Sequence, residues 1–267
     1  MNNDAIKEML LKLENTDIDF TVTLSGKESP KVNGLYKPDT HEIILHNKNF
    51  KSDNMMVYTA IHEYTHHLLT EKKLDETNGL DYGSGRAHTN EFWAKFHSLL
   101  EIAEQQGLYV MGLEDAPELA ALTEDIRKNY IEKNGELMLE FGKKLKEAHD
   151  LCEKANIRYE DYIDRILRLP RTAATSIRKI SRDNLNPALG YDNMKIVSAI
   201  SNPQKRTEAE EQILAGKSPD TVRQMMKKKV EDIDVRTRLE KEKKRLEKTI
   251  EQLSSRLEMV EEKLSVL

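Results

Sequence analysis

The sequence predicts an α+β protein in which a small domain, with a short antiparallel sheet and packed helices, precedes an all-helical segment and a C-terminal coiled coil. Strand-like alternation of β-branched and apolar residues is concentrated in residues 20–46, which predicts a small sheet. After Ala116 almost all of the sequence has helical periodicity. We therefore expect four parts: a domain over 1–113, a helical linker over 114–155, a helical segment over 156–230 and a coiled coil over 231–267.

The composition favours one modest globular domain with an extended helical part. Of the 267 residues, 33% are charged and only 6% are aromatic, and the mean hydropathy is −0.69, which is little apolar material for one large core. No apolar run reaches the length of about eighteen residues that a membrane helix needs, and the N-terminal residues lack the pattern of a secretory signal. The single cysteine, Cys152, cannot form an internal disulfide. We therefore expect a cytoplasmic protein with no membrane partner.

The overall net charge of −5 conceals a difference between segments. Residues 1–112 contain 11 lysines and arginines against 17 acidic residues, whereas residues 156–230 contain 15 against 9. This asymmetry predicts that the two segments meet different partners.

The first domain is predicted to contain three strands and three helices. Residues 20–24 alternate as a strand does, and residues 32–36 and 42–46 form a hairpin around a turn that contains Pro38 and Asp39. Helices are expected over residues 5–15, about 53–70 and about 89–106. A glycine-rich loop, NGLDYGSG, separates the last two helices.

A metal site is predicted within the second of these helices. His62, Glu63 and His66 form an HExxH motif inside the apolar stretch VYTAIHEYTHHLL. Residues four apart lie on one helical face, so both imidazoles can reach one ion. Zn²⁺ accepts such ligands, and Glu63 beside the first ligand can take a proton from a metal-bound water as general base. This chemistry is typical of a zinc metallopeptidase.

The third ligand is expected to be His88, which follows the glycine-rich loop and begins the helix HTNEFWAKFHSLL. Glu91, His97 and Asp81 are the alternatives. His97 lies about two and a half helical turns beyond His88 and should point away from whatever His88 faces.

The succession GLYKPDTHEIILHNKNF, TAIHEYTHHLL and RAHTNEFWAKF, over roughly residues 30–110, resembles the SprT-like zincin metallopeptidases. The ImmA-type peptidases share the HExxH core and are similar. The resemblance implies His62, His66 and His88 as ligands with Glu63 as catalyst. It also implies that the strand over Glu42–His46 is the edge along which a peptide substrate pairs. The sequence departs from some SprT-like proteins in lacking a cysteine-rich zinc ribbon. No oxyanion-stabilising residue is identified, although Tyr82 and Arg86 are candidates.

A DNA-binding segment is predicted in the basic part of the chain. The stretch YEDYIDRILRLPRTAATSIRKISRD has the pattern of helix, turn, helix, with small residues facing inward. The residues expected on the outer face of its second helix are Arg171, Thr172, Thr175, Arg178 and Lys179. The following residues, most visibly LAGKSPDTVRQMM, resemble the helical DNA-binding region of ParB-like proteins. A basic, solvated helical bundle that serves as a spacer is the alternative.

The last segment has apolar heptad positions at Leu239, Leu246, Leu253, Val260 and Leu267, with Ile250, Leu257 and Leu264 in the second series. This pattern predicts a coiled coil that makes a homodimer. Together these features predict a Zn²⁺-dependent endopeptidase that acts on a protein substrate associated with DNA. One alternative is a DNA-binding partition or regulatory protein with a zincin-like scaffold, although a scaffold does not need Glu63. The other is a peptidase whose helical tail only assembles subunits.

Overall fold

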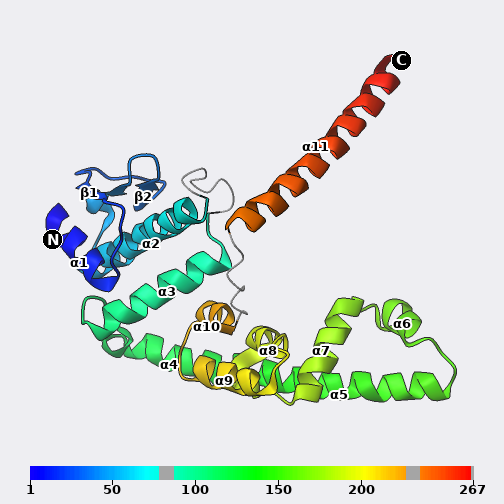
Figure 1. The fold of residues 1–267 in the computed structure, drawn as a ribbon. Helices are drawn as coiled ribbons and strands as arrows, with labels where there is room; N and C mark the ends of the chain where they lie inside the picture. Colours follow the sequence, from blue (N-terminus) through cyan, green and yellow to red (C-terminus); the bar gives the residue numbers. More distant parts are fainter. Residues whose placement is uncertain (78–86, 227–234, 266–267) are drawn as a thin grey trace. The chain divides into compact units, whose positions relative to one another are not determined.

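The computed structural model describes residues 1–77, 87–226 and 235–265. Contacts divide the chain into two units, one of Met1–Leu69 and Gly85–Lys227 and one of Thr70–Ser84 and Lys228–Leu267. The described residues are mostly helical and contain one three-stranded sheet, so the α+β class is confirmed (Figure 1). The candidate site residues Asp81, Tyr82 and Arg86, and the predicted heptad residue Leu267, lie outside the described residues.

The sheet consists of β1 (Thr21–Leu24), β2 (Gly34–Lys37) and β3 (Glu42–Leu45), in the order β1-β3-β2. The β2–β3 hairpin is antiparallel as predicted, but β1 pairs with β3 in parallel. The expectation of an antiparallel sheet was therefore wrong for one of its two pairings. The connection after β1 crosses to the far side of β3, where it is held by hydrogen bonds from the Gly26 and Ser29 N–H groups to the Asn47 and Asn49 side chains (2.8 and 3.0 Å). Contacts of this kind between distant residues cannot be predicted from the alternation of apolar and polar residues along a strand.

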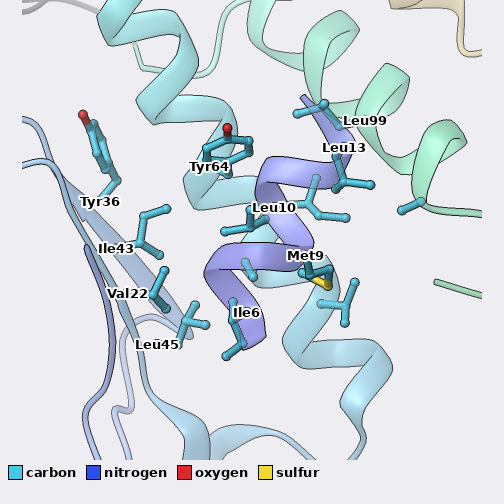
Figure 2. Packing of buried hydrophobic residues seen from close by; sticks show 14 of the residues in the cluster. Ile6, Met9, Leu10, Leu13, Val22, Tyr36, Ile43, Leu45, Tyr64 and Leu99 are labelled. Carbon is cyan, nitrogen blue, oxygen red and sulfur yellow. The ribbon is translucent and has the colours of Figure 1, made fainter. Parts of the chain in front are cut away.

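Three helices pack with the sheet: α1 (Asn3–Leu13), α2 (Asp53–Thr77) and α3 (Asn90–Gln105). The Asn2 side chain caps α1 by accepting a hydrogen bond from the Ala5 N–H at 2.8 Å. Figure 2 shows how the apolar face of α1 meets the inner face of the sheet and the ring of Tyr64 on α2. The residues of α1 that it buries are Ile6, Met9, Leu10 and Leu13. This core fixes the position of α2 against the sheet.

The rest of the first unit is helical. Its helices are α4 (Pro117–Ile126), α5 (Lys133–Lys154), α6 (Tyr159–Asp161), α7 (Arg171–Asp183), α8 (Gly190–Ser198), α9 (Pro203–Leu214) and α10 (Pro219–Met226). π-helical turns over Arg127–Glu132 and Tyr162–Leu167 follow α4 and α6. Short 3₁₀ turns occupy Asn47–Asn49, Leu113–Asp115 and Pro187–Leu189.

Helix α5 runs along this helical part and packs against α7 and α8 (Figure 1). Leu145 on α5 is 1% exposed and packs with Ile163, Ala174 and Ile177. Gly142 lets α5 approach α7 closely, because a Cβ at this position would lie only 2.3 Å from the Cβ of Ser181. Residues 114–155, which we expected to form a linker, therefore supply a helix against which α7 and α8 pack.

Helix α10 packs against α3 of the first domain. The Ser218 hydroxyl lies 2.6 Å from Nδ1 of His97, and the Thr221 hydroxyl donates to the carbonyl of Ala94 at 3.4 Å. The helical part is thus attached directly to the helix that follows His88.

The second unit contains α11 (Val235–Ser265), which confirms one long helix over most of residues 231–267. The apolar side chains at its heptad positions are 47–62% exposed, and they are Leu246, Ile250, Leu253, Leu257 and Val260. No helix among the described residues has the length and apolarity to cross a membrane.

Candidate metal centre

Helix α2 presents His62 and His66 on the same face. The two imidazoles are one turn apart, and their centroids are separated by 5.1 Å. Other faces of the helix are buried in the core through Ile61, Tyr64 and Leu68. Because burial of these residues fixes the rotation of α2, it also determines where the two histidines point.

His88 is brought to these histidines by the start of α3. Thr89 is the N-cap of α3, and its hydroxyl accepts a hydrogen bond from the Phe92 N–H at 3.3 Å. Nε2 of His88 lies 3.0 Å from Nε2 of His62. One ring nitrogen from each of His62, His66 and His88 lies within 4.8 Å of the others, the one such group of metal-ligating residues in the described part of the chain. These three histidines can hold a metal ion.

The alternative third ligands do not join this group where the structure describes them. Glu91 is not among the converging residues. His97 is half-buried and contacts Ser218 instead, so it faces away from His88 as its spacing predicts. His88 is therefore the residue that completes the cluster.

Phe92 forms a wall against which all three imidazoles pack. Its ring centroid lies 4.8 Å from His62, 4.4 Å from His66 and 4.7 Å from His88, and its side chain is fully buried. A rigid aromatic surface restricts the rotation of each ring and excludes water from one side of the cluster. The motif showed an aromatic residue four positions after His88, but its contact with all three rings depends on the packing of α3 on α2.

Burial and the neighbouring His88 lower the pKa of His62 to about 4. His62 is therefore neutral at physiological pH, with a nitrogen lone pair available to a metal. Because a metal does not have to displace a proton from this residue, the folded protein is prepared for metal binding.

Glu63 is buried beside the cluster, with only 7% of the residue exposed. Burial raises its pKa to about 7, although a hydrogen bond from the Tyr36 backbone to the carboxylate opposes the rise. Gly34 makes room for this side chain: a Cβ there would lie 2.9 Å from Cγ of Glu63 and 2.8 Å from Cγ2 of Thr59. The sequence reasoning gave no role to Gly34, whose only local signal is a glycine at the start of a strand.

A buried polar cluster joins β2 to α2 next to Glu63. The Tyr36 hydroxyl lies 3.2 Å from Nδ1 of His67 and 3.0 Å from Nδ1 of His41. Nε2 of His67 lies 3.1 Å from the Ile18 carbonyl and 3.0 Å from the Thr16 hydroxyl. His67 is fully buried, so it ties the strand that contacts Glu63 to the helix that carries Glu63.

No family model, curated protein or solved structure matches the chain. The function is accordingly inferred from the geometry of its sites.

The strand expected to bind substrate is not at the edge of the sheet. β3 is central and is paired on both sides, so the expectation that Glu42–His46 forms the edge was wrong. It failed because the order of strands depends on where β1 docks. Beside Glu63 the outer strand is β2, and the His46 N–H donates to the Asn33 carbonyl at its start. Given this register, the N–H and carbonyl groups of Gly34 and Tyr36 point away from β3.

The residues predicted to contact DNA are all on α7, but only some of them share a surface. Arg171 forms a hydrogen-bonded ion pair with Asp164, and Thr172 is exposed next to it. The other three residues line a groove between α5 and α7: Thr175, Arg178 and Lys179. The groove also contains cations of α5 that the sequence reasoning did not anticipate.

Proposed function

We propose that this protein is a zinc-dependent endopeptidase. The observation that carries the proposal is the convergence of three imidazoles beside a buried carboxyl group, Glu63. A histidine cluster alone is compatible with a structural metal, but an adjacent acid with a pKa near 7 provides a base suited to neutral pH.

The residues of the cluster suit Zn²⁺ in number and type. Three nitrogen ligands leave a fourth tetrahedral position open, which is the arrangement of catalytic zinc sites. Nitrogens about 2.05 Å from a tetrahedral ion lie about 3.3 Å apart, close to the 3.0 Å between Nε2 of His62 and Nε2 of His88. When bound, zinc would lower the pKa of a water molecule and polarise the carbonyl of the scissile peptide.

The protein's own residues would supply the remaining steps. Glu63 takes the proton of the attacking water and later transfers it to the departing amine. A substrate in extended conformation pairs with the outward N–H and carbonyl groups of Gly34 and with the outward carbonyl group of Tyr36 on β2. The backbone of Tyr36 also hydrogen-bonds to the Glu63 carboxylate, so substrate binding and the position of the base are coupled through one residue. The substrate is accordingly a peptide segment that can become extended.

The energetics of Glu63 favour an enzyme over a zincin-like scaffold in a DNA-binding regulatory protein. Burying a carboxyl group opposes its ionisation and destabilises the fold at neutral pH. A scaffold would gain from replacing Glu63 with a neutral residue, whereas a peptidase needs the base at this position.

Metal content tests whether the three histidines form a zinc site, and cleavage tests whether that site is catalytic. Zinc per chain would be measured by mass spectrometry for the wild type, His88→Ala, Glu63→Gln and His97→Ala. We expect about one zinc per chain in the wild type, a sharp decrease in His88→Ala, and little change in the other two, because neither Glu63 nor His97 is a ligand. His97→Ala is a matched control, since it removes another histidine of the same segment.

Cleavage of an unfolded protein such as casein provides the second readout. Glu63→Gln should retain zinc and lose cleavage by at least about a hundredfold, the lower range for a general base. Wild-type protein that binds no zinc after reconstitution would exclude a zinc peptidase. Zinc binding with equal cleavage by wild type and Glu63→Gln would exclude the proposed role of Glu63.

A further inference from the structure

A groove of about 760 Å³, lined by charged and polar residues, lies between α5 and α7 and shares no residue with the metal centre. Gly142 and Ser181 are at the closest approach of the two helices, where the Ser181 hydroxyl donates to the Leu139 carbonyl at 3.0 Å. This packing holds the two walls of the groove in place.

The charges along this groove are nearly all positive. Its lining contains one carboxylate, Asp150, which lies 3.5 Å from Nδ1 of His149. Against it stand five cationic side chains: Lys143, Lys146, Arg178, Lys179 and Arg182. The lining pairs two lysines of α5 with three cations of α7, so the groove is positive on both walls. The other acidic residues of α5, such as Glu147, lie outside the lining.

Most of these cations are not neutralised within the chain. Lys143, Lys146 and Lys179 have no carboxylate within 4.0 Å in the part of the chain that the structure describes. Arg182 contacts Asp183 at 3.3 Å, but that carboxylate also binds Arg206 at 2.6 Å. A groove lined by like charges raises the free energy of the isolated protein and attracts an anion.

On the α7 wall of the groove, the side chain of Arg178 is held in a defined orientation. The guanidinium of Arg178 lies over the ring of Tyr159, 5.1 Å from its centroid. Stacking on an aromatic ring immobilises the guanidinium plane while its N–H groups remain able to donate at the edge. Arg178 is half-buried, so this contact positions a donor in the groove at little entropic penalty.

The chemistry of the lining distinguishes between polyanions. No lining residue has a purely hydrocarbon side chain, and Thr175 and Ser181 add hydroxyl groups. The apolar surface of the groove belongs to the aliphatic parts of charged and polar side chains, so no aliphatic or aromatic residue forms a pocket for an apolar side chain of an acidic peptide. A sugar–phosphate backbone requires only cations and hydroxyl donors, and a groove of this volume accommodates more than one phosphate group.

We propose that the α5–α7 groove binds the phosphodiester backbone of a nucleic acid. The contacts come from both helices, so the binding surface includes Lys143 and Lys146 on α5 in addition to α7. Because they are made to phosphates, the binding is independent of base sequence. It requires neither zinc nor cleavage, so this inference does not depend on the proposed function.

The test uses the full-length, zinc-loaded chain and fluorescently labelled oligonucleotides about 20 residues long. Single-stranded and duplex DNA and RNA are measured separately by anisotropy, so that the form of the phosphodiester is identified. The variant replaces Lys143, Lys146 and Lys179 with glutamine. The matched control replaces Lys31, Lys48 and Lys51, three exposed lysines of the first domain, so that the same charge is removed elsewhere. Circular dichroism and zinc content check that both variants remain folded.

Five phosphate contacts should make the logarithm of the association constant fall with the logarithm of salt concentration at a slope of about −3.5 to −4.5. The groove variant should bind at least about tenfold more weakly at low salt. The magnitude of its slope should also be smaller by about 2–3, because each lysine–phosphate contact contributes roughly one to the slope. The control variant should behave as the wild type. Equal binding by the two variants, no binding at low salt, or equal affinity for polyglutamate of the same length would overturn the proposal.

Discussion

Replacing Glu63 with glutamine removes a carboxyl group that the fold buries beside three histidines while preserving the shape of the side chain. Burial raises the pKa of Glu63 from 4.5 to about 7. At pH values between 4.5 and about 7, Glu63 keeps its proton in the folded protein and loses it in the unfolded chain. The free energy of unfolding of the metal-free wild type should therefore decrease as the pH rises, and Glu63→Gln should lack this contribution.

The pKa shift determines the size of this effect. A shift of about 2.5 units corresponds to roughly 3.4 kcal/mol, at about 1.4 kcal/mol per unit. The stabilising contribution is fully present below the unfolded pKa and is lost as the pH rises through the folded pKa. Between pH 5 and pH 8.5, linkage gives a loss of about 2.5 kcal/mol, because part of the contribution has already been lost at pH 5.

Urea unfolding in the presence of a chelator measures the difference between the two proteins at each pH. The low pKa of His62 is present in both proteins, so its contribution largely cancels. Glu8→Gln on α1, where the side chain is exposed, controls for the loss of a carboxyl group as such. We expect Glu63→Gln to become more stable relative to the wild type by about 2.5 kcal/mol at the higher pH.

A stability difference that is the same at pH 5 and pH 8.5 would refute the reasoning, since it would mean that the folded protein does not oppose ionisation of Glu63. A difference of opposite sign would show instead that a positive neighbour stabilises the carboxylate. Zinc provides a further check, because its charge favours the ionised carboxyl group and should reduce the difference.

Three further substitutions test other features. Gly34→Ala should destabilise the fold by about 1–3 kcal/mol and reduce peptide cleavage more than zinc binding, because its Cβ would displace Glu63; unfolding and zinc titrations measure both. Phe92→Leu should weaken zinc binding by about tenfold, since it removes the ring against which three imidazoles pack; competition with a metal indicator measures this. Leu253→Lys should convert a homodimer into monomers in analytical ultracentrifugation, because it places a charge in the exposed heptad stripe of α11.

Each of these three substitutions has an outcome that would contradict the stated reason. Thr59→Ser combined with Gly34→Ala should recover part of the stability, since it removes one of the contacted atoms; no recovery would place the strain elsewhere. Unchanged zinc affinity in Phe92→Leu would show that the Phe92 ring does not orient the histidines. Ser254→Lys adds the same charge beside the stripe. Dissociation by both lysine variants, or a monomeric wild type, would contradict pairing through α11.

Several features followed from the sequence because they depend on neighbours a few residues away. The positions of His62 and His66 on one face of α2 require only helical periodicity. The hairpin of β2 and β3 needed only alternation and a turn, and the length of α11 was evident from its heptads. In each case the interactions that define the element lie within the element, so local sequence determines it.

Other features were decided by contacts between elements. The sequence favoured His88 as the third ligand but left Glu91, His97 and Asp81 as alternatives, and the packing of α3 on α2 brought His88 to the cluster. β1 joined β3 in parallel, so β3 is central and the outer strand beside Glu63 is β2, where Gly34 lies against Glu63. These outcomes depend on which surfaces meet, and many arrangements are compatible with the same local pattern.

The basic groove between α5 and α7 was also predicted only in part from the sequence. The sequence indicated an excess of cations over residues 156–230, and it identified Arg178 and Lys179 on one helix. Only the close approach of α5 at Gly142 adds a second row of lysines opposite them. Sequence periodicity thus determined which residues share a helix face, whereas tertiary packing decided which faces oppose one another, because such pairing is set by the burial of apolar surface across the whole unit.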